Sequence, residues 1–313
     1  MQDVIVTNEL KKRFGDVWAL RGLNLRVGKG ITGFIGPNGA GKTVTVRILL
    51  GYLKPTSGEA FMFGYDCWKE SIKIRKRVGV MLENPAYPRS IPCKKYLKMA
   101  AELRGYSRNE AEKVTDELLG FVGLDKMKDR PIGKLSAGMR RRFALANALI
   151  GEPEFLILDE PTANMDVVGR IDLLRKIEEL HKERGIGIMV STHILSELEK
   201  ICTNVVFINN GVVIESGQIE TLLRKYGLSY TKFEIKTEDL DTIGNLLKSF
   251  SSVKEVIVEK EKMFVKVYDR DKFLNEVKDM PANTKSIMSI REVGVERRLE
   301  ALFETIFKRE VKE

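Results

Sequence analysis

The stretch ITGFIGPNGAGKT, residues 31–43, decides the fold of this 313-residue chain. Its first five residues form a short, largely apolar run that stops at Gly36, as a buried strand does, and the TVTVRILLGYL segment (43–53) reads as a helix. Between them, GPNGAGKT (36–43) fits the pattern G-x-x-x-x-G-K-[ST]. A strand, a glycine-rich loop and a helix in this order predict a nucleotide-binding α/β domain.

Each residue type in this loop has a chemical reason to be there. The glycines let backbone N–H groups wrap a phosphate, Lys42 reaches the β and γ oxygens, and Thr43 offers its hydroxyl to Mg²⁺. A merely flexible glycine-rich turn would not explain Lys followed by Thr. The residues expected to bind ATP here are Gly36, Pro37, Asn38, Gly39, Ala40, Gly41, Lys42, Thr43 and Val44.

Two further strands end in polar residues that suit the same chemistry. FLILDE (155–160) predicts a buried strand that places Asp159 and Glu160 at the carboxyl edge of the sheet, where α/β folds bind ligands. Asp159 is expected to hold Mg²⁺ through water, and Glu160 to orient and deprotonate the attacking water. His193 follows a third strand, GIGIMVS (185–191), and is expected to contact the γ-phosphate. The alternatives are a helix-capping acidic pair and a structural histidine.

LSAGM, residues 135–139, predicts a second anion site, because Ser136 leads into a helix whose first backbone N–H groups lack partners within the helix. The glycine-rich loop, LSAGM, LILDEPTANMD (156–166) and STH (191–193), in this order and spacing, resemble an ABC-type ATPase over about residues 1–220.

That resemblance implies a head-to-tail dimer in which two ATP molecules are sandwiched between subunits. Ser136 and the N–H of Gly138 would then act on the partner's ATP, and Asp166 would lie across the dimer interface. It also implies that Phe14 stacks on adenine, the alternative being a core phenylalanine. The signature loop expected to face the partner's ATP comprises Leu135, Ser136, Ala137, Gly138 and Met139.

The sequence departs from the family pattern at three places. Ala137 and Met139 replace a glycine and a glutamine of the signature, and Ala is small enough to preserve close approach. Val44 replaces a threonine, so its backbone N–H remains but a hydroxyl contact to the α-phosphate is lost. Glu83 stands where the family usually has Gln; as a Mg²⁺ ligand it should strengthen the metal contact and repel the γ-phosphate. The net effect on hydrolysis stays open.

The strand and helix pattern predicts two domains. Residues 1–225 read as the α/β P-loop ATPase domain with a largely parallel sheet and an inserted helical subdomain at about 84–150. Residues 226–313 follow the order β-α-β-β-α-β, a small ferredoxin-like α+β domain, and finish with an amphipathic helix. We expect that helix to pack on its own domain, the alternative being a docking face. Its LEALFETIF sequence (299–307) resembles drug-efflux ATP-binding subunits, which pair with a separately encoded membrane permease and mostly export.

Composition limits the remaining options. No apolar run reaches 18 residues and no signal-like segment opens the chain, while the three cysteines are too scattered for a disulfide framework or a metal cluster. This suits a cytoplasmic protein. The net charge is +9, and residues 69–142 hold 19 Lys and Arg against 9 Asp and Glu. Such a basic segment could face nucleic acid, an anionic membrane or an acidic partner, or simply aid solubility.

Two functions therefore compete. The first is the ATP-hydrolysing subunit of a membrane exporter, which would act as a dimer, with a homodimer expected, at the cytoplasmic face of the membrane through its permease. The second is a nucleic-acid-linked ABC ATPase for translation or repair. The chain has one P-loop and a compact insertion without heptads, so we expect no nucleic-acid partner. Salt-sensitive binding to DNA or RNA would favour the second function.

Overall fold

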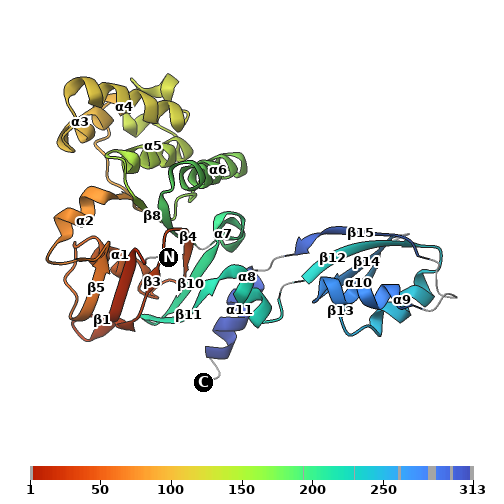
Figure 1. Cartoon of the computed structure of the whole chain (residues 1–313). Coiled ribbons are helices and arrows are strands. Elements are labelled where there is room, and N and C mark those ends of the chain that lie inside the picture. Colours follow the sequence, from red (N-terminus) through yellow and green to blue (C-terminus); the bar gives the residue numbers. More distant parts are fainter. Residues whose placement is uncertain are drawn as a thin grey trace. The chain divides into compact units, whose positions relative to one another are not determined.

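The computed structural model describes residues 3–192, 194–228, 230–259, 262–280, 287–296 and 299–310. It divides into two compact units, Met1–Gln218 and Ile219–Glu313, each of which is described by itself (Figure 1). The sequence predicts a boundary after residue 225. The division falls earlier because helix α8 (Ile219–Lys225) belongs to the second unit, where it contacts the last helix, α11 (Leu299–Glu310).

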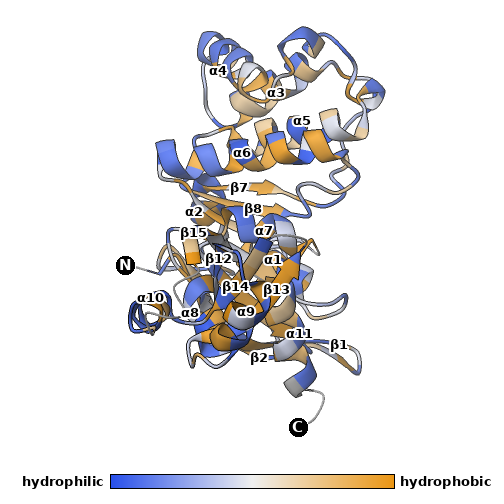
Figure 2. Cartoon of the chain, turned by 90° about the vertical axis from the view of Figure 1, so that its right-hand side faces the viewer, coloured by the Kyte–Doolittle hydropathy of each residue, from blue (hydrophilic) through white to orange (hydrophobic). Residues whose placement is uncertain are grey.

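A six-stranded sheet forms the centre of the first unit. The edge strand β11 is antiparallel to β10, and every other pair of neighbouring strands in this sheet is parallel. Every residue of β4, β8 and β9 is buried, as expected for strands covered on both faces, and Figure 2 shows β7 and β8 as hydrophobic strands. These three buried strands were all predicted. In spatial order the sheet consists of β11 (Val212–Gln218), β10 (Asn204–Asn209), β4 (Ile31–Ile35), β9 (Gly187–Ser191), β8 (Phe155–Asp159) and β7 (Val78–Met81).

A second, antiparallel sheet corrects the expectation that the first domain holds one largely parallel sheet. A tight turn at Gly15–Asp16 joins its first two strands, and so short a link permits only antiparallel pairing. The sheet consists of β1 (Ile5–Phe14), β2 (Val17–Leu23), β3 (Arg26–Val27), β5 (Ser57–Met62) and β6 (Tyr65–Asp66).

Helix α1 (Lys42–Leu49) shares one hydrophobic core with both sheets. The burial of each large apolar side chain contributes about 1.5–3 kcal/mol, so this core holds α1 firmly against β4. Core residues come from the antiparallel sheet (Leu10, Leu20, Met62), from α1 (Val46, Ile48, Leu49) and from the central sheet (Phe34, Ile157, Met189). The other helices of the unit outside the inserted subdomain are α2 (Ser71–Arg77), α6 (Val167–Arg184) and α7 (Leu195–Ile201).

The predicted helical subdomain lies between β7 and β8 in the chain. Its helices α3 (Cys93–Leu103), α4 (Arg108–Phe121) and α5 (Ala137–Leu149) gather together, with short 3₁₀ turns η1 (Asp125–Met127) and η2 (Ile132–Lys134) between α4 and α5 (Figure 1). A capping box of Ser107 and Glu110 starts α4. The Glu112 carboxylate lies 2.5 Å from both Lys94 Nζ and Lys98 Nζ, which ties α4 to α3.

The second unit confirms the predicted ferredoxin-like order. Its antiparallel sheet has the strand order β13–β14–β12–β15, and a core that includes Phe233, Val265 and Phe273 joins the sheet to its helices. On α11, Leu299 and Leu302 are fully buried, and the helix contacts α8, whose residues the sequence predicts to be part of the first domain. The elements are β12 (Tyr230–Thr237), α9 (Leu240–Lys248), β13 (Val253–Glu259), β14 (Lys262–Val267), α10 (Arg270–Lys278) and β15 (Ile287–Glu296). Among the described residues, none of the helices combines the length and apolar character that crossing a bilayer requires.

Candidate active site

The glycine-rich loop turns from the end of β4 into α1, and two of its glycines are required by close packing. A Cβ at Gly36 would lie 2.3 Å from the carbonyl oxygen of Ile208, on the neighbouring strand β10. Gly41 has φ +107° and caps α1, and a Cβ there would lie 2.7 Å from Leu20 Cδ2. No side chain caps the start of α1, so its first N–H groups remain available to an anion.

Lys42 folds back over this loop. Its Nζ donates to the carbonyl oxygens of Gly36 at 2.5 Å and Pro37 at 3.0 Å. Burial lowers the pKa of the Lys42 ammonium, and the carboxylates of Glu160 and Asp159 oppose that shift. The loop lysine and the two strand-end carboxylates therefore lie within electrostatic reach of one another.

Asp159 and Glu160 are held by the neighbouring strand. Asp159, the last residue of β8, is buried and accepts a hydrogen bond from the Ser191 hydroxyl at the end of β9. Glu160 has φ +48°, a costly conformation for a residue other than glycine, and its N–H donates to the Ser191 carbonyl at 2.8 Å. This turn carries the chain away from the sheet edge directly after the two carboxylates.

A cavity of about 370 Å³ unites the predicted residues. Phe14, Val17 and Trp18 line it together with Glu83, Asp159, Glu160 and the loop residues Pro37, Asn38, Gly39, Ala40, Gly41, Lys42, Thr43 and Val44. Phe14 is 47% exposed, which excludes the core alternative for that residue. Trp18, 38% exposed, was not anticipated. A tryptophan four residues after Phe14, beyond a Gly-Asp pair that predicts a turn, is the sequence signal that could have identified it.

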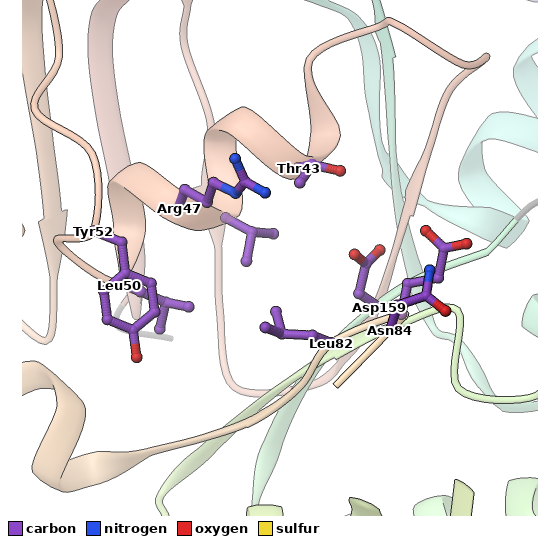
Figure 3. A pocket seen from close by; sticks show the side chains of 9 residues that line it. Thr43, Arg47, Leu50, Tyr52, Leu82, Asn84 and Asp159 are labelled. Carbon is purple, nitrogen blue, oxygen red and sulfur yellow. The ribbon is translucent and has the colours of Figure 1, made fainter. Parts of the chain in front are cut away.

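A second cavity, of about 460 Å³, shares Thr43 and Asp159 with the first. Figure 3 shows Thr43 and Arg47 from α1 on one wall and Leu82, Asn84 and Asp159 on the other. Glu83 lines both cavities, so it borders the space between Thr43 and Asp159.

These oxygen donors fit Mg²⁺. A hydroxyl (Thr43) and two carboxylates (Glu83, Asp159) border one space, and hard oxygen ligands are what Mg²⁺ takes. In the described part of the chain, no cluster of three or more His, Cys, Asp or Glu residues offers a ready-made metal cage. Mg²⁺ usually relies on one or two carboxylates, water and substrate phosphates, so such a cage is not needed here.

The LSAGM segment starts α5 as the sequence predicts. Ser136 is the N-cap, and its hydroxyl accepts a hydrogen bond from the Met139 N–H at 3.2 Å. Leu135 is buried, and its carbonyl accepts from Arg140 Nη1 at 2.6 Å. A Cβ on Gly138 would meet its nearest neighbour, Met165 Cε, only at 3.6 Å, an ordinary contact. Packing within this chain therefore does not explain the glycine at 138.

The ANMD segment leads into α6. Asp166 is its exposed N-cap and accepts a hydrogen bond from the Gly169 N–H at 2.7 Å. Val167 and Val168, at the start of α6, are 70% and 77% exposed. Two adjacent apolar side chains in solvent are a feature of surfaces that contact another protein.

His193 lies outside the described residues. The flanking segments are described: β9 ends at Ser191, and α7 begins at Leu195. Sequence reasoning missed a polar contact in this region, in which the hydroxyl of Thr162 donates to the buried Glu197 carboxylate on α7. It links the segment after Glu160 to the helix after residue 193.

Comparison with known proteins gives consistent matches. The sequence profile of the ABC transporter family matches residues 20–163. A bacitracin transport ATP-binding protein from Bacillus licheniformis is 38% identical over 240 residues, covering 76% of this chain and 77% of that protein. A daunorubicin resistance ATP-binding protein from Streptomyces coeruleorubidus is 34% identical over 229 residues, 72% of each. A solved ATP-binding subunit of an ABC transporter matches with a TM-score of 0.65 at 27% identity, covering 72% of this chain and 94% of that one. Nothing in these matches supports a nucleic-acid-linked ATPase.

Proposed function

Because the chain belongs to the ATP-binding proteins of ABC transporters, we propose that it hydrolyses ATP to power the export of an antibiotic-type compound. The observation that carries the ATPase part is the meeting of the P-loop with Asp159 and Glu160 around one cavity. The export part is supported by relatives named for bacitracin transport and daunorubicin resistance.

In the proposed reaction, the loop N–H groups and Lys42 bind the triphosphate, and Phe14 stacks on adenine with Trp18 beside it. Glu160 orients the attacking water and accepts its proton, and His193 contacts the γ-phosphate. Mg²⁺, held by Thr43, Glu83 and Asp159, would supply charge neutralisation on the phosphates.

We propose that the working unit is a head-to-tail pair of these chains. Two surface features support this arrangement. The N-terminus of α5 leaves Gly138 open to an approaching ligand, and Val167 and Val168 beside Asp166 present apolar surface to solvent. In the pair, Ser136 and the N–H of Gly138 would complete the partner's ATP site.

A separate permease would carry the transport path. The described helices include no bilayer-spanning candidate. We place the chain at the cytoplasmic face of the membrane because it would be held there by binding to such a permease. The net positive charge of residues 69–142 suits a surface that lies near anionic lipid headgroups.

The test is native co-purification from membranes, followed by reconstitution of the recovered complex into lipid vesicles. Bacitracin and daunorubicin serve as transport probes. We expect an integral membrane protein to co-purify and ATP-dependent movement of at least one probe, with the same complex carrying Glu160→Gln as the inactive control. Recovery without a membrane protein, or equal transport with and without ATP, would refute the exporter assignment.

A further inference from the structure

Arg141 is a buried cation on α5, only 7% exposed. Its guanidinium donates to two carbonyls on separate segments: Nη1 to Leu82 O and Nε to Ala163 O, each at 3.3 Å. Leu82 directly precedes Glu83, and Ala163 lies in the turn after Glu160. One side chain of the helical subdomain therefore connects the two segments that flank the proposed active site.

The neighbouring arginines are engaged elsewhere. Arg140 binds the Leu135 carbonyl, and Arg142 lies 3.2 Å from Asp172 on α6. Arg140 and Arg141 both line the cavity that Glu83 lines, and Arg141 is the one that donates to carbonyls of both segments flanking the site.

The site holds three carboxylates and receives positive charge from two directions. Lys42 interacts with Glu160 and Asp159 from the P-loop side. Burial lowers the pKa of the Arg141 guanidinium, and the carboxylates of Glu83, Glu160 and Asp159 oppose that shift. A guanidinium stays protonated despite such a shift, so Arg141 remains a cation at this position.

Glu83 and Arg141 also line one cavity of about 190 Å³, between the start of α5 and the 83–87 segment. The far end of that segment is fixed to the same helix, because the Tyr87 ring packs edge-on against Phe143 of α5 with centroids 5.2 Å apart. Helix α5 therefore holds the segment around Glu83 at two points, Arg141 before it and Tyr87 after it.

We propose that Arg141 is a positioning residue for Glu83: it fixes the Leu82 carbonyl and balances the Glu83 carboxylate, so that this charge is tolerated beside the triphosphate. The inference rests on the proposed ATPase function and assigns Arg141 a role in it. Without Arg141, the negative charge of Glu83 would act unbalanced on the phosphates, and the segment would lose one of its two attachments.

A double-mutant cycle tests the pairing. The full chain is compared as wild type, Glu83→Gln, Arg141→Gln and the double variant, with kcat and KM for MgATP as the readouts. Arg141→Gln removes the charge but keeps an amide that can still donate to one carbonyl. We expect it to raise KM at least tenfold in the wild-type background and less than threefold in the Glu83→Gln background. A purely structural role for Arg141 would produce the same factor in both backgrounds, and that result would overturn the proposal.

Arg141→Lys is the matched variant, because it keeps the charge and loses the paired donors. We expect its KM for MgATP to stay within about threefold of wild type, and a loss as large as that of Arg141→Gln would contradict the charge balance. If Arg141→Gln unfolds, which thermal denaturation will reveal, Arg141→Lys is judged against the wild type alone, and a tenfold or larger rise in its KM would contradict the charge balance. A wild-type protein without ATPase activity would refute the proposed function itself. An active wild type with an additive cycle would refute only the role of Arg141.

Discussion

Gly138→Ala should stabilise the isolated chain and impair its activity. Gly138 is the second residue of α5, where alanine is favoured over glycine, by less than the roughly 1 kcal/mol of a helix interior. The added Cβ would meet Met165 at 3.6 Å, so no clash within the chain offsets this gain. In the proposed pair, however, the same methyl group projects into the space where the partner's ATP approaches the Gly138 N–H.

We expect the free energy of unfolding in urea to rise by less than about 1 kcal/mol, while ATP turnover falls at least tenfold. A second assay follows dimer formation with ATP in the Glu160→Gln background by size-exclusion chromatography. There, adding Gly138→Ala should shift the protein toward monomer. The opposite signs of the two effects separate a contact with a partner from a fault in folding.

Gly120→Ala on α4 is the matched control. Gly120 is also a helical glycine, and a Cβ there would meet nothing within 4 Å. It should gain similar stability and keep its full turnover. If Gly138→Ala hydrolyses ATP and dimerises as well as Gly120→Ala does, the assignment of Gly138 to the partner's nucleotide is wrong.

Three further predictions concern the same molecule. Glu160→Gln should lower turnover by about 10²–10⁴, roughly 3–5 kcal/mol of barrier, and leave ATP binding intact; unchanged turnover would exclude Glu160 as the general base. Lys42→Ala and Ser136→Arg subunits should each be inactive alone, yet a mixture should regain ATPase activity because the heterodimer contains one undamaged site; a mixture as inactive as its components would argue against shared sites. Two lysines hydrogen-bonded to Glu112 lower its carboxyl pKa from 4.5 to about 2, so its contribution to stability is present above pH 4.5 and is lost as the pH falls toward 2. Acid unfolding of Glu112→Gln should therefore lack part of the pH dependence seen in the wild type between these values.

Local patterns in the sequence predicted the parts of the site that lie at strand ends. The run ITGFI ends at a glycine that no other residue could replace sterically, and β4 has the predicted bounds, Ile31–Ile35. FLILDE similarly placed Asp159 at the end of β8. In both cases a short apolar run and its polar terminus determine the result within a few residues of chain.

Contacts between distant segments were not accessible in this way. Arg141 read as one of several basic residues, because its burial depends on carbonyls 59 and 22 residues away in the chain. The antiparallel sheet was missed because its strands are partly exposed and carry many charges, as in KKRF of β1, which hides the apolar alternation. Tertiary burial, rather than local preference, decides both features.

Helix α5 carries Ser136 at its N-cap and Arg141 five residues later, little more than one helical turn away. At a rise of about 1.5 Å per residue, the two positions are roughly 7–8 Å apart along the helix axis. In the proposed pair the first residue touches the partner's nucleotide and the second acts beside the chain's own. A rigid helix cannot move at one of these positions without moving at the other, so occupancy of one site changes the free energy of occupying the second. Turnover should therefore depend on ATP concentration with a Hill coefficient different from one, and a coefficient of one would argue against coupling through this helix.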